Sequence, residues 1–234
     1  MELRLLAIRH GETVWSRERR FAGSKDVPLT AEGRRQCAAL AEALAGSSIA
    51  AVYASPLARA RESAEPLAAA RGVPLKLEPD FREMGFGDWE GLTREEVAHR
   101  FPDDYAAWRT TPERFARPGG EPLTAVAERV SRALAALRVT HDKETVVLVS
   151  HAVVTRLLVL AALGLGPERL WSVEASPAGI SEIEYRDDWA TVHRVNTLSH
   201  LTSWGASEGP PIPPHARSAP GNPGRPSNPG PSGT

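Results

Sequence analysis

The sequence predicts an α/β fold with a mostly parallel central sheet. Short apolar runs rich in β-branched residues alternate with longer stretches whose apolar residues recur at helical spacing. Such alternation is typical of strands that are joined through helices, and this connection makes neighbouring strands parallel. No segment repeats, and the 234 residues are enough for one sizeable domain with an appendage.

The expected elements follow in chain order, and the last two strands form a hairpin at one edge of the sheet. Strands are expected over Leu3–Ile8, Ala51–Tyr53, Leu75–Leu77, Val146–Val149, Ser181–Tyr185 and Thr191–Val195. Helices are expected over Ala31–Ala45, Leu57–Ala70, Arg94–His99, Pro122–Leu137 and Val153–Leu163.

Two of the helices have recognisable start signals. Thr30 can cap the helix that follows it, and Gly46 can end that helix. Ser55 and Pro56 have the pattern of an N-cap followed by proline at the first helical position. This pattern predicts that the second long helix begins directly after the second strand.

The C-terminal part of the chain has a different composition. From Gly205 to Thr234 there are 9 Pro and 6 Gly, with few apolar side chains between them. Such a segment buries too little apolar surface to offset its chain entropy. We therefore predict one domain over residues 1–201 and a disordered Pro/Gly/Ser-rich tail over residues 202–234. A passive tail is favoured over a ligand for a polyproline-binding partner.

Charge and cysteine content narrow the class of protein. The formal net charge is -1, so the chain offers no overall attraction to nucleic acid or to an anionic membrane. The apolar stretch Ala152–Leu165 contains Arg156 and is shorter than the roughly 20 residues that span a bilayer. Cys37 is the single cysteine, which excludes an internal disulfide and favours a reducing compartment. We expect a cytoplasmic protein without nucleic-acid or membrane partners.

Charged and polar side chains gather where the predicted strands end. Arg9-His10 follow the first strand, Ser55 to Arg59 follow the second, and Ser150-His151 follow the fourth. Glu83 comes shortly after the third strand. Open α/β sheets bind ligands beyond the carboxyl ends of their strands, so these groups are expected to share one crevice. Arginines and a helix N-terminus both favour anions, and the pattern therefore predicts a site for a small, highly charged anion.

Other chemistries fit the sequence less well. The seven histidines lack the spacing of a metal site, so neither a metal nor a cofactor is expected. Ser150 beside His151 has the residue types of a nucleophile and its base, but no Gly-x-Ser-x-Gly elbow is present. Cys37 lies within a predicted helix, away from the strand ends. Each charged residue also has an ordinary interpretation, such as an arginine on a solvated helix face, and only their joint placement favours a site.

Five segments, in this order along the chain, resemble those of a known family. They are LLAIRHGETVWS, YASPLARARESAEPL, FREMGFGDWEG, PGGE and VVLVSHAVVTRLL, which lie between Leu5 and Leu158. Together they resemble the histidine phosphatase superfamily with its phosphoglycerate mutase-like fold. The later VHRVNTLSHL resembles the end of the small bacterial phosphatase branch. The resemblance implies a three-layer α/β sandwich, with a small helical cap insertion.

The resemblance also implies a role for each matching residue. His10 matches the nucleophile that forms a phosphohistidine intermediate, and Glu83 matches the general acid and base. Arg9 and Arg59 match the arginines that hold the phosphoryl oxygens, and His151 matches a second histidine that stabilises the transition state. Neutral imidazole is a competent nucleophile. Two arginines and a protonated His151 would supply charge stabilisation without a metal.

The expected contacts with substrate extend beyond these catalytic residues. The full set of expected substrate-binding residues is Arg9, Gly11, Glu12, Thr13, Ser16, Arg59, Glu83, His151 and Ala152. Ser16 departs from the family pattern, which often has an asparagine there as a donor to the phosphate. A serine hydroxyl still donates one hydrogen bond, so a retuned pocket is expected. Gly11 is expected to bring the backbone close to the ligand.

The leading hypothesis is a metal-independent phosphomonoesterase that hydrolyses a small phosphorylated metabolite. A phosphoglycerate mutase is the runner-up, although the family's mutases carry a longer insertion than Gly91–Arg117 provides. A third hypothesis is a degenerate phosphatase that binds phosphate esters and displays its tail to a partner. The presence of every expected catalytic residue argues against this third hypothesis. A homodimer is also an open alternative.

The substrate stays open among α-ribazole phosphate, glucosyl-3-phosphoglycerate, other sugar phosphates and phosphoglycerates. Leaving-group specificity is expected to come from Phe101–Pro118, which should cap the crevice. Its candidate contacts are Tyr105, Trp108, Arg109 and Arg114. Each of the four fits equally well as a core or surface residue of a small helical insertion.

Overall fold

The computed structural model describes residues 1–201, and the predicted tail over residues 202–234 lies outside this range. Six strands form one sheet in the order β3-β2-β4-β1-β5-β6. Their bounds are Glu2–Arg9 (β1), Ala51–Ala54 (β2), Leu75–Leu77 (β3), Glu144–Ser150 (β4), Ile180–Arg186 (β5) and Trp189–Thr197 (β6). The first four strands pair in parallel, whereas β5 and β6 are antiparallel. The mostly parallel sheet and its hairpin edge are thus confirmed.

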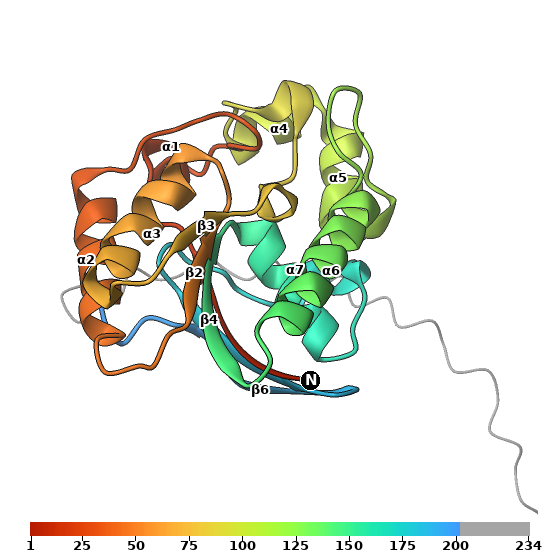
Figure 1. Cartoon of the computed structure of the whole chain (residues 1–234). Helices are drawn as coiled ribbons and strands as arrows, with labels where there is room; N and C mark the ends of the chain where they lie inside the picture. Colours follow the sequence, from red (N-terminus) through yellow and green to blue (C-terminus); the bar gives the residue numbers. More distant parts are fainter. Residues whose placement is uncertain (202–234) are drawn as a thin grey trace, which may run out of the picture. The chain divides into compact units, whose positions relative to one another are not determined.

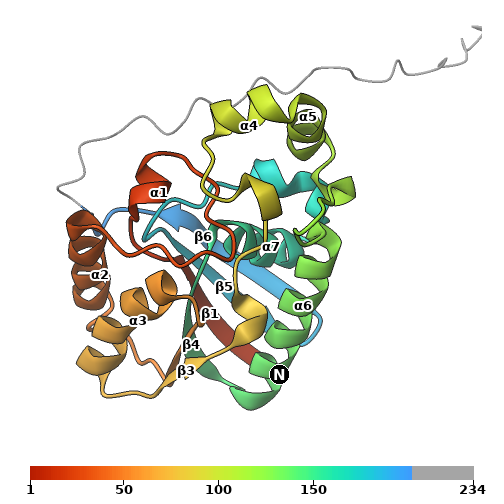
Figure 2. The same cartoon turned by 90° about the horizontal axis from the view of Figure 1, so that it is seen from above.

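Four long helices cover the sheet on its two faces. Helices α2 (Ala31–Ala43) and α3 (Ala58–Arg71) lie on one face, and α6 (Leu123–Thr140) and α7 (Ala152–Ala162) lie on the other (Figures 1 and 2). This arrangement is the three-layer sandwich that the resemblance implied. Helix α7 is buried along most of its length because it packs against the sheet on one side and α6 on the other.

Three shorter helices lie over the carboxyl ends of the strands (Figure 1). They are α1 (Val14–Arg17), α4 (Arg94–Arg100) and α5 (Pro102–Thr110). Of these three short helices, only α4 was expected from the sequence. Helix α1 has four residues, too few to show a period, and α5 buries only Trp108 among its nine residues. An amphipathic stripe, which is the main sequence signal of a helix, is therefore missing from both.

The two start signals had different outcomes. Thr30 caps α2 as predicted, because its Oγ1 accepts from Gly33 N at 2.9 Å, but α2 ends at Ala43, before Gly46. The prediction for Ser55-Pro56 was wrong. Helix α3 begins at Ala58, after an N-cap residue that offers no side-chain hydrogen bond. The hydroxyl of Ser55 instead faces the strand ends.

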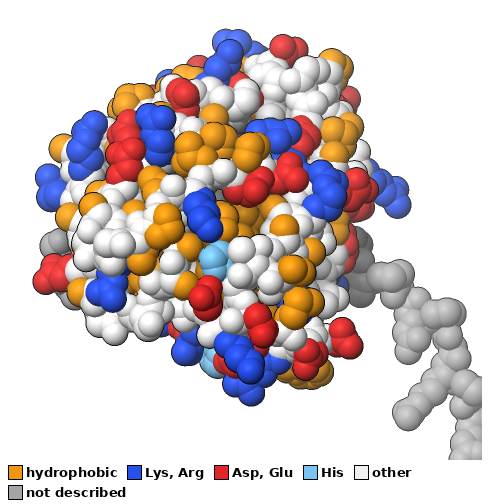
Figure 3. Space-filling view, in the orientation of Figure 1, with side chains coloured by type: hydrophobic (Ala, Val, Ile, Leu, Met, Phe, Trp, Pro, Cys, Tyr) orange, Lys and Arg blue, Asp and Glu red, His pale blue; other side chains and the backbone are white. Residues whose placement is uncertain are grey.

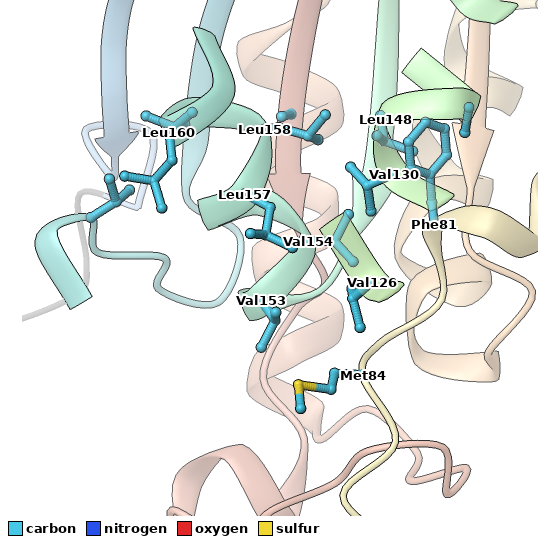
Figure 4. Packing of buried hydrophobic residues seen from close by; sticks show 14 of the residues in the cluster. Phe81, Met84, Val126, Val130, Leu148, Val153, Val154, Leu157, Leu158 and Leu160 are labelled. Carbon is cyan, nitrogen blue, oxygen red and sulfur yellow. The ribbon is translucent and has the colours of Figure 1, made fainter. Parts of the chain in front are cut away.

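The main core lies between the sheet and the α6–α7 layer (Figure 4). It also includes Phe81 and Met84, which belong to the segment that follows β3. Trp108 of the cap is only 2% exposed and packs against Phe115 and Trp171, with ring centroids 5.1 Å away in both cases. Of the two interpretations of Trp108, the structure therefore favours the core residue over the substrate contact.

The distribution of charge on one face and the helices of residues 1–201 bear on possible partners. On the face that Figure 3 shows, basic side chains are interspersed with acidic ones rather than gathered in one patch. Within residues 1–201, no helix is both long and apolar enough to cross a bilayer.

Candidate active site

Strand pairing places two histidines side by side. β1 and β4 are parallel neighbours, and Arg9 is the register partner of Ser150. His10 and His151 are the next residues of the two strands, and His10 N donates to Ser150 O at 2.9 Å. Their ring centroids are 5.2 Å apart, with an interplanar angle of 61°. Two imidazoles therefore lie side by side at the carboxyl ends of the strands, where the sequence predicted the binding crevice.

His10 is held in one tautomer by the groups beside its ring nitrogens. Nδ1 lies 2.7 Å from the carbonyl oxygen of Gly11, which can only accept, so Nδ1 carries the proton. The Nε of Arg59, which can only donate, lies 3.3 Å from Nε2, so Nε2 presents its lone pair. Burial, and then the charges of Arg59 and Arg9, hold the pKa of His10 well below its ordinary value. The ring is neutral at neutral pH.

Arg59 is fixed by main-chain carbonyls rather than by a carboxylate. It lies in the first turn of α3, is 0% exposed, and donates from Nη1 to Lys25 O at 2.6 Å and from Nη2 to Gly23 O at 2.8 Å. These two bonds orient its Nε toward His10. Burial lowers the pKa of Arg59, and the charge of Glu83 opposes that effect.

His151 has a hydrogen-bond partner at one ring nitrogen and none at the other within residues 1–201. Its Nε2 lies 2.7 Å from the hydroxyl oxygen of Ser55, which is itself fully buried. Its Nδ1 is buried and has no hydrogen-bond partner in the described part of the chain. Burial, followed by the charges of Arg59 and His10, holds the pKa of His151 well below its ordinary value. The protonated form of His151 that was expected during phosphoryl transfer stays a prediction.

Arg9 and Glu83 complete the charged set. Arg9 Nη1 donates to Ala175 O at 2.8 Å, while burial and the neighbouring Arg156 lower the pKa of Arg9 to about 10, so it stays charged at neutral pH. Glu83 is 8% exposed, and its Oε1 accepts from Met84 N at 3.0 Å.

The carboxylate of Glu83 also touches the N-terminus of α7. Glu83 Oε2 accepts from Val153 N at 3.4 Å, one residue beyond Ala152, which begins the helix. The orphan N–H groups and the partial positive charge of this helix end face the strand ends. An anionic group beside Glu83 and His151 would meet the same favourable field.

The polar side chains of the loop after β1 have partners of their own. Glu12 Oε1 accepts from Arg17 Nη2 at 2.6 Å and from Thr30 Oγ1 at 2.8 Å. Ser16 and Thr13 form a reciprocal capping box at α1, and Ser16 Oγ in addition donates its proton to Thr13 O at 2.9 Å. The expected contact of Ser16 with a phosphoryl group stays a prediction, and it requires this hydroxyl to leave Thr13.

Gly11 is required by the packing against α2. A Cβ atom on Gly11 would lie 2.6 Å from the carbonyl oxygen of Gly33, and its own N–H donates to Ser63 Oγ at 2.9 Å. A Cβ on Gly33 would lie 2.1 Å from Glu12 O. The close approach expected at Gly11 exists, but its partner in this structure is a helix rather than a ligand.

The described residues contain no group of three or more His, Cys, Asp and Glu side chains that could hold a metal ion. The groups that the strand ends bring together are two imidazoles, two guanidinium groups and one carboxylate. Such a set can bind a phosphoryl group, attack it at phosphorus and transfer a proton.

The comparison with known proteins assigns the chain to a family whose name fits this chemistry. The pattern that defines the histidine phosphatase superfamily (branch 1) matches residues 5–198. The chain belongs to the histidine phosphatase superfamily. The match covers nearly all of the described residues and includes every candidate catalytic residue.

Individual histidine phosphatases are similar over most of their length. Phosphoserine phosphatase 1 of Hydrogenobacter thermophilus is 32% identical over 199 residues, which are 85% of this chain and 94% of that protein. The adenosylcobalamin/alpha-ribazole phosphatase of Escherichia coli is 31% identical over 195 residues, which are 83% of this chain and 96% of that protein. The solved structure of Bacillus stearothermophilus YhfR gives a TM-score of 0.80 at 32% identity, covering 85% of this chain and 99% of that one.

These findings confirm the family, the fold and the enzyme class predicted from the sequence. The roles of individual residues stay predictions, which the geometry now makes specific. Sequence reasoning gave no catalytic or supporting role to two polar residues near the catalytic set. Ser55 was placed at the strand ends but interpreted as a helix cap, and Arg129, which is only 3% exposed, was not singled out.

Proposed function

We propose that the protein is a metal-independent phosphomonoesterase that hydrolyses a small phosphorylated metabolite through a phosphohistidine on His10. The observation that carries the proposal is the state of this ring. It is buried and neutral, its Nδ1 proton is bound to Gly11 O, and its Nε2 lone pair faces the guanidinium of Arg59. A nucleophile for phosphorus needs this combination of a free lone pair and adjacent positive charge.

The first step transfers the phosphoryl group to the enzyme. The substrate's phosphoryl oxygens take over the hydrogen bond of Arg59 Nε and are also held by Arg9 and the N-terminus of α7. His10 Nε2 forms a bond to phosphorus as the ester P–O bond breaks. Glu83, which must enter this step in its protonated form, donates its proton to the leaving oxygen, so the product leaves as an alcohol. The phosphoryl dianion favours protonation of His151, whose open Nδ1 would then donate to it.

The second step returns the enzyme to its starting state. Glu83, now a carboxylate, accepts a proton from a water molecule that attacks the phosphorus from the side of the departed alcohol. The P–N bond to His10 breaks, and inorganic phosphate leaves. The proton balance is closed because Glu83 gives one proton in the first step and regains one in the second.

The cap is the proposed source of leaving-group specificity. Arg109 stacks on the rings of Tyr105 and Trp171, at 5.9 and 6.0 Å from their centroids. The relatives described above are named for phosphoserine and for α-ribazole phosphate, both phosphomonoesters of small metabolites. We therefore propose a substrate of this size class, with the cap contacting its organic part.

The cellular location is part of the same proposal. Cys37 is a free, buried thiol, and burial raises its pKa, which keeps it in the unreactive protonated form. A single free thiol supports a cytoplasmic location. The homodimer and the lack of a nucleic-acid partner stay predictions.

The test is phosphate release from a panel of phosphomonoesters with EDTA present. The panel contains phosphoserine, α-ribazole phosphate, glucosyl-3-phosphoglycerate and common sugar phosphates. Wild type is compared with His10→Ala, and His193→Ala is the matched control because His193 lies on β6 and pairs only with Glu184. We expect release by wild type and by the control, near-complete loss in His10→Ala, and an acid-labile phosphoenzyme after rapid quenching.

Two other results would reject the proposal in favour of its alternatives. Exchange of phosphate between phosphoglycerates without net release would identify a mutase. Binding of phosphate esters without turnover by a folded wild type would identify a degenerate phosphatase. Loss of release on addition of EDTA would contradict metal independence alone.

A further inference from the structure

The segment that carries Glu83 has little secondary structure to hold it. It leaves β3 through one turn of 3-10 helix, Pro79–Phe81, and then runs on as an irregular chain. Nevertheless, the four consecutive carbonyl oxygens of residues 80–83 all accept hydrogen bonds from buried side chains. Ser150 Oγ donates to Phe81 O at 2.7 Å, and Arg129 of α6 donates to the other three.

Arg129 uses every donor that a guanidinium possesses. Nη1 donates to Asp80 O at 2.6 Å and to Arg82 O at 2.7 Å, and Nη2 donates to Glu83 O at 3.2 Å. Nε and the second Nη2 proton donate to the two carboxylate oxygens of Glu121, at 2.8 and 2.9 Å. All five N–H groups are thereby satisfied in a side chain that is 3% exposed.

Glu121 belongs to the PGGE motif, and this motif is itself bound to the loop that follows Glu83. Glu121 N donates to Gly85 O at 2.8 Å, and Gly120 is bridged to Phe86. Burial, the largest single effect, would raise the pKa of Glu121, but the hydrogen bonds and charge of Arg129 together with the charge of Arg82 lower it, so the counterion stays charged.

The apolar neighbours of Glu83 are fixed by the same helix. Phe81 and Met84, on either side of Glu83, are fully buried in the core cluster that includes Val126 and Val130 of α6 (Figure 4). The carboxylate of Glu83 is thus the polar end of a segment whose backbone and apolar side chains are both anchored to α6.

We propose that Arg129, with Glu121 as its counterion, is the positioning residue of the general acid Glu83. The proposal rests on the phosphatase function proposed above. Proton transfer requires the carboxyl within hydrogen-bond reach of the leaving oxygen, and a displacement of about 1 Å can cost about 100-fold in rate. All the N–H groups of Arg129 are used on the segment of Glu83 and on Glu121, so none is free to contact a substrate. Its charge also lowers the pKa of His151, so the test must separate an effect on proton donation by Glu83 from an effect on phosphate binding.

The experiment compares two esters that differ in their need for an acid. The leaving oxygen of phosphoserine, or of the best alkyl ester in the panel, must be protonated, whereas 4-nitrophenyl phosphate releases a stable phenolate. The measured quantity is kcat/KM, which reports the formation of the phosphoenzyme. The variants are Arg129→Met, Arg129→Lys and Glu83→Gln. Arg132→Met is the matched control, because Arg132 lies one turn further along α6, is exposed and pairs only with Asp80.

We expect Arg129→Met to lower kcat/KM about 100-fold for the alkyl ester but less than about fivefold for 4-nitrophenyl phosphate. Glu83→Gln should show the same difference between the two esters. Arg129→Lys keeps the charge but cannot reach all three carbonyls, so it should fall between wild type and Arg129→Met. The double variant Arg129→Met/Glu83→Gln should lose little more than Glu83→Gln alone, because both act on one proton transfer. Arg132→Met should match wild type.

Equal losses on both esters, or losses that multiply in the double variant, would overturn the proposal and leave a purely structural role for Arg129. If Arg129→Met does not fold, the ratio of the two esters in Arg129→Lys decides the question by the same criterion. A wild type that releases phosphate from neither ester would instead overturn the phosphatase function, and with it the role of Glu83.

Discussion

Replacement of Ser55 by alanine removes the hydrogen bond that holds the His151 ring. Ser55 Oγ lies 2.7 Å from Nε2, and Nδ1 has no partner within residues 1–201, so the ring of Ser55→Ala keeps neither nitrogen paired. A buried polar atom that loses its partner costs about 1–3 kcal/mol. In a domain of this size each kcal/mol corresponds to about 2–4 °C, so a fall in Tm of about 2–12 °C is expected.

The same substitution should weaken phosphate binding. The hydrogen bond between Ser55 and a neutral ring contributes about 1 kcal/mol, and one to an imidazolium contributes about 2–3 kcal/mol. Because the unliganded His151 is neutral and a bound dianion favours its protonated form, the bond strengthens on binding. The difference of about 1–2 kcal/mol predicts a dissociation constant for inorganic phosphate that is about 5- to 30-fold higher in Ser55→Ala.

Isothermal titration with phosphate at pH 7.5 and a thermal melt measure the two effects separately. Ser181→Ala is the matched control, because Ser181 is 1% exposed and Ser55 0%, but within residues 1–201 Ser181 accepts only from Asn196 N, at 3.1 Å. It should lose stability without losing affinity. If Ser55→Ala binds phosphate as tightly as wild type, the ring does not become an imidazolium supported by Ser55, and the role proposed for His151 fails.

Two further predictions concern stability. Because His10 and His151 are neutral in the folded protein and take up protons when it unfolds, the unfolded state binds more protons below their ordinary pKa of 6.5. Urea unfolding in phosphate-free buffer should show a loss of about 1.4 kcal/mol per pH unit for each histidine below that pH, and a flat profile in wild type would contradict their burial as neutral rings. Gly33→Ala should destabilise the protein by about 1–3 kcal/mol despite better helix propensity, because its Cβ would meet Glu12 O, whereas Gly46→Ala has no neighbour within 4 Å and should be neutral or stabilising. Equal denaturation midpoints for the two alanine variants would refute the close packing of the loop on α2.

The catalytic core of the site could be predicted because its signals are local. Arg9-His10 and Ser150-His151 directly follow apolar strands, and the topology rule for open sheets brings such positions together. Arg59 was predicted from the resemblance, and its spacing on the helix could not by itself distinguish it from Arg61. Arg59 is fully buried, whereas Arg61 is exposed and pairs with Glu65 at 3.5 Å.

The supporting residues could not be predicted because their roles depend on contacts between distant segments. Ser55 has the sequence context of a helix cap, but the helix begins three residues later, and its partner is 96 positions away. Ser16 completes a capping box with serine in place of the usual acidic or amide residue, at a helix too short to detect. In both cases the local sequence pattern fits more than one role, and only the contact with a distant residue or the observed helix shows which role the serine has.

Three buried arginines of this fold donate hydrogen bonds to main-chain carbonyl oxygens, which lowers the free-energy cost of burying their charge. Arg59 is held by the carbonyls of residues 23 and 25, Arg156 donates to Val173 O at 2.8 Å, and Arg129 donates to three carbonyls of the acid-bearing segment. A buried charge is tolerated when its donors are satisfied, and carbonyl oxygens do this without neutralising it. Arg59 therefore keeps its charge for an anion while its geometry is fixed. Arg156 and Arg129 differ from Arg59 because each also has a carboxylate partner, Glu174 at 3.5 Å and Glu121 at 2.8 Å. The partner of Arg129 suits a residue that orients Glu83 without itself attracting the substrate.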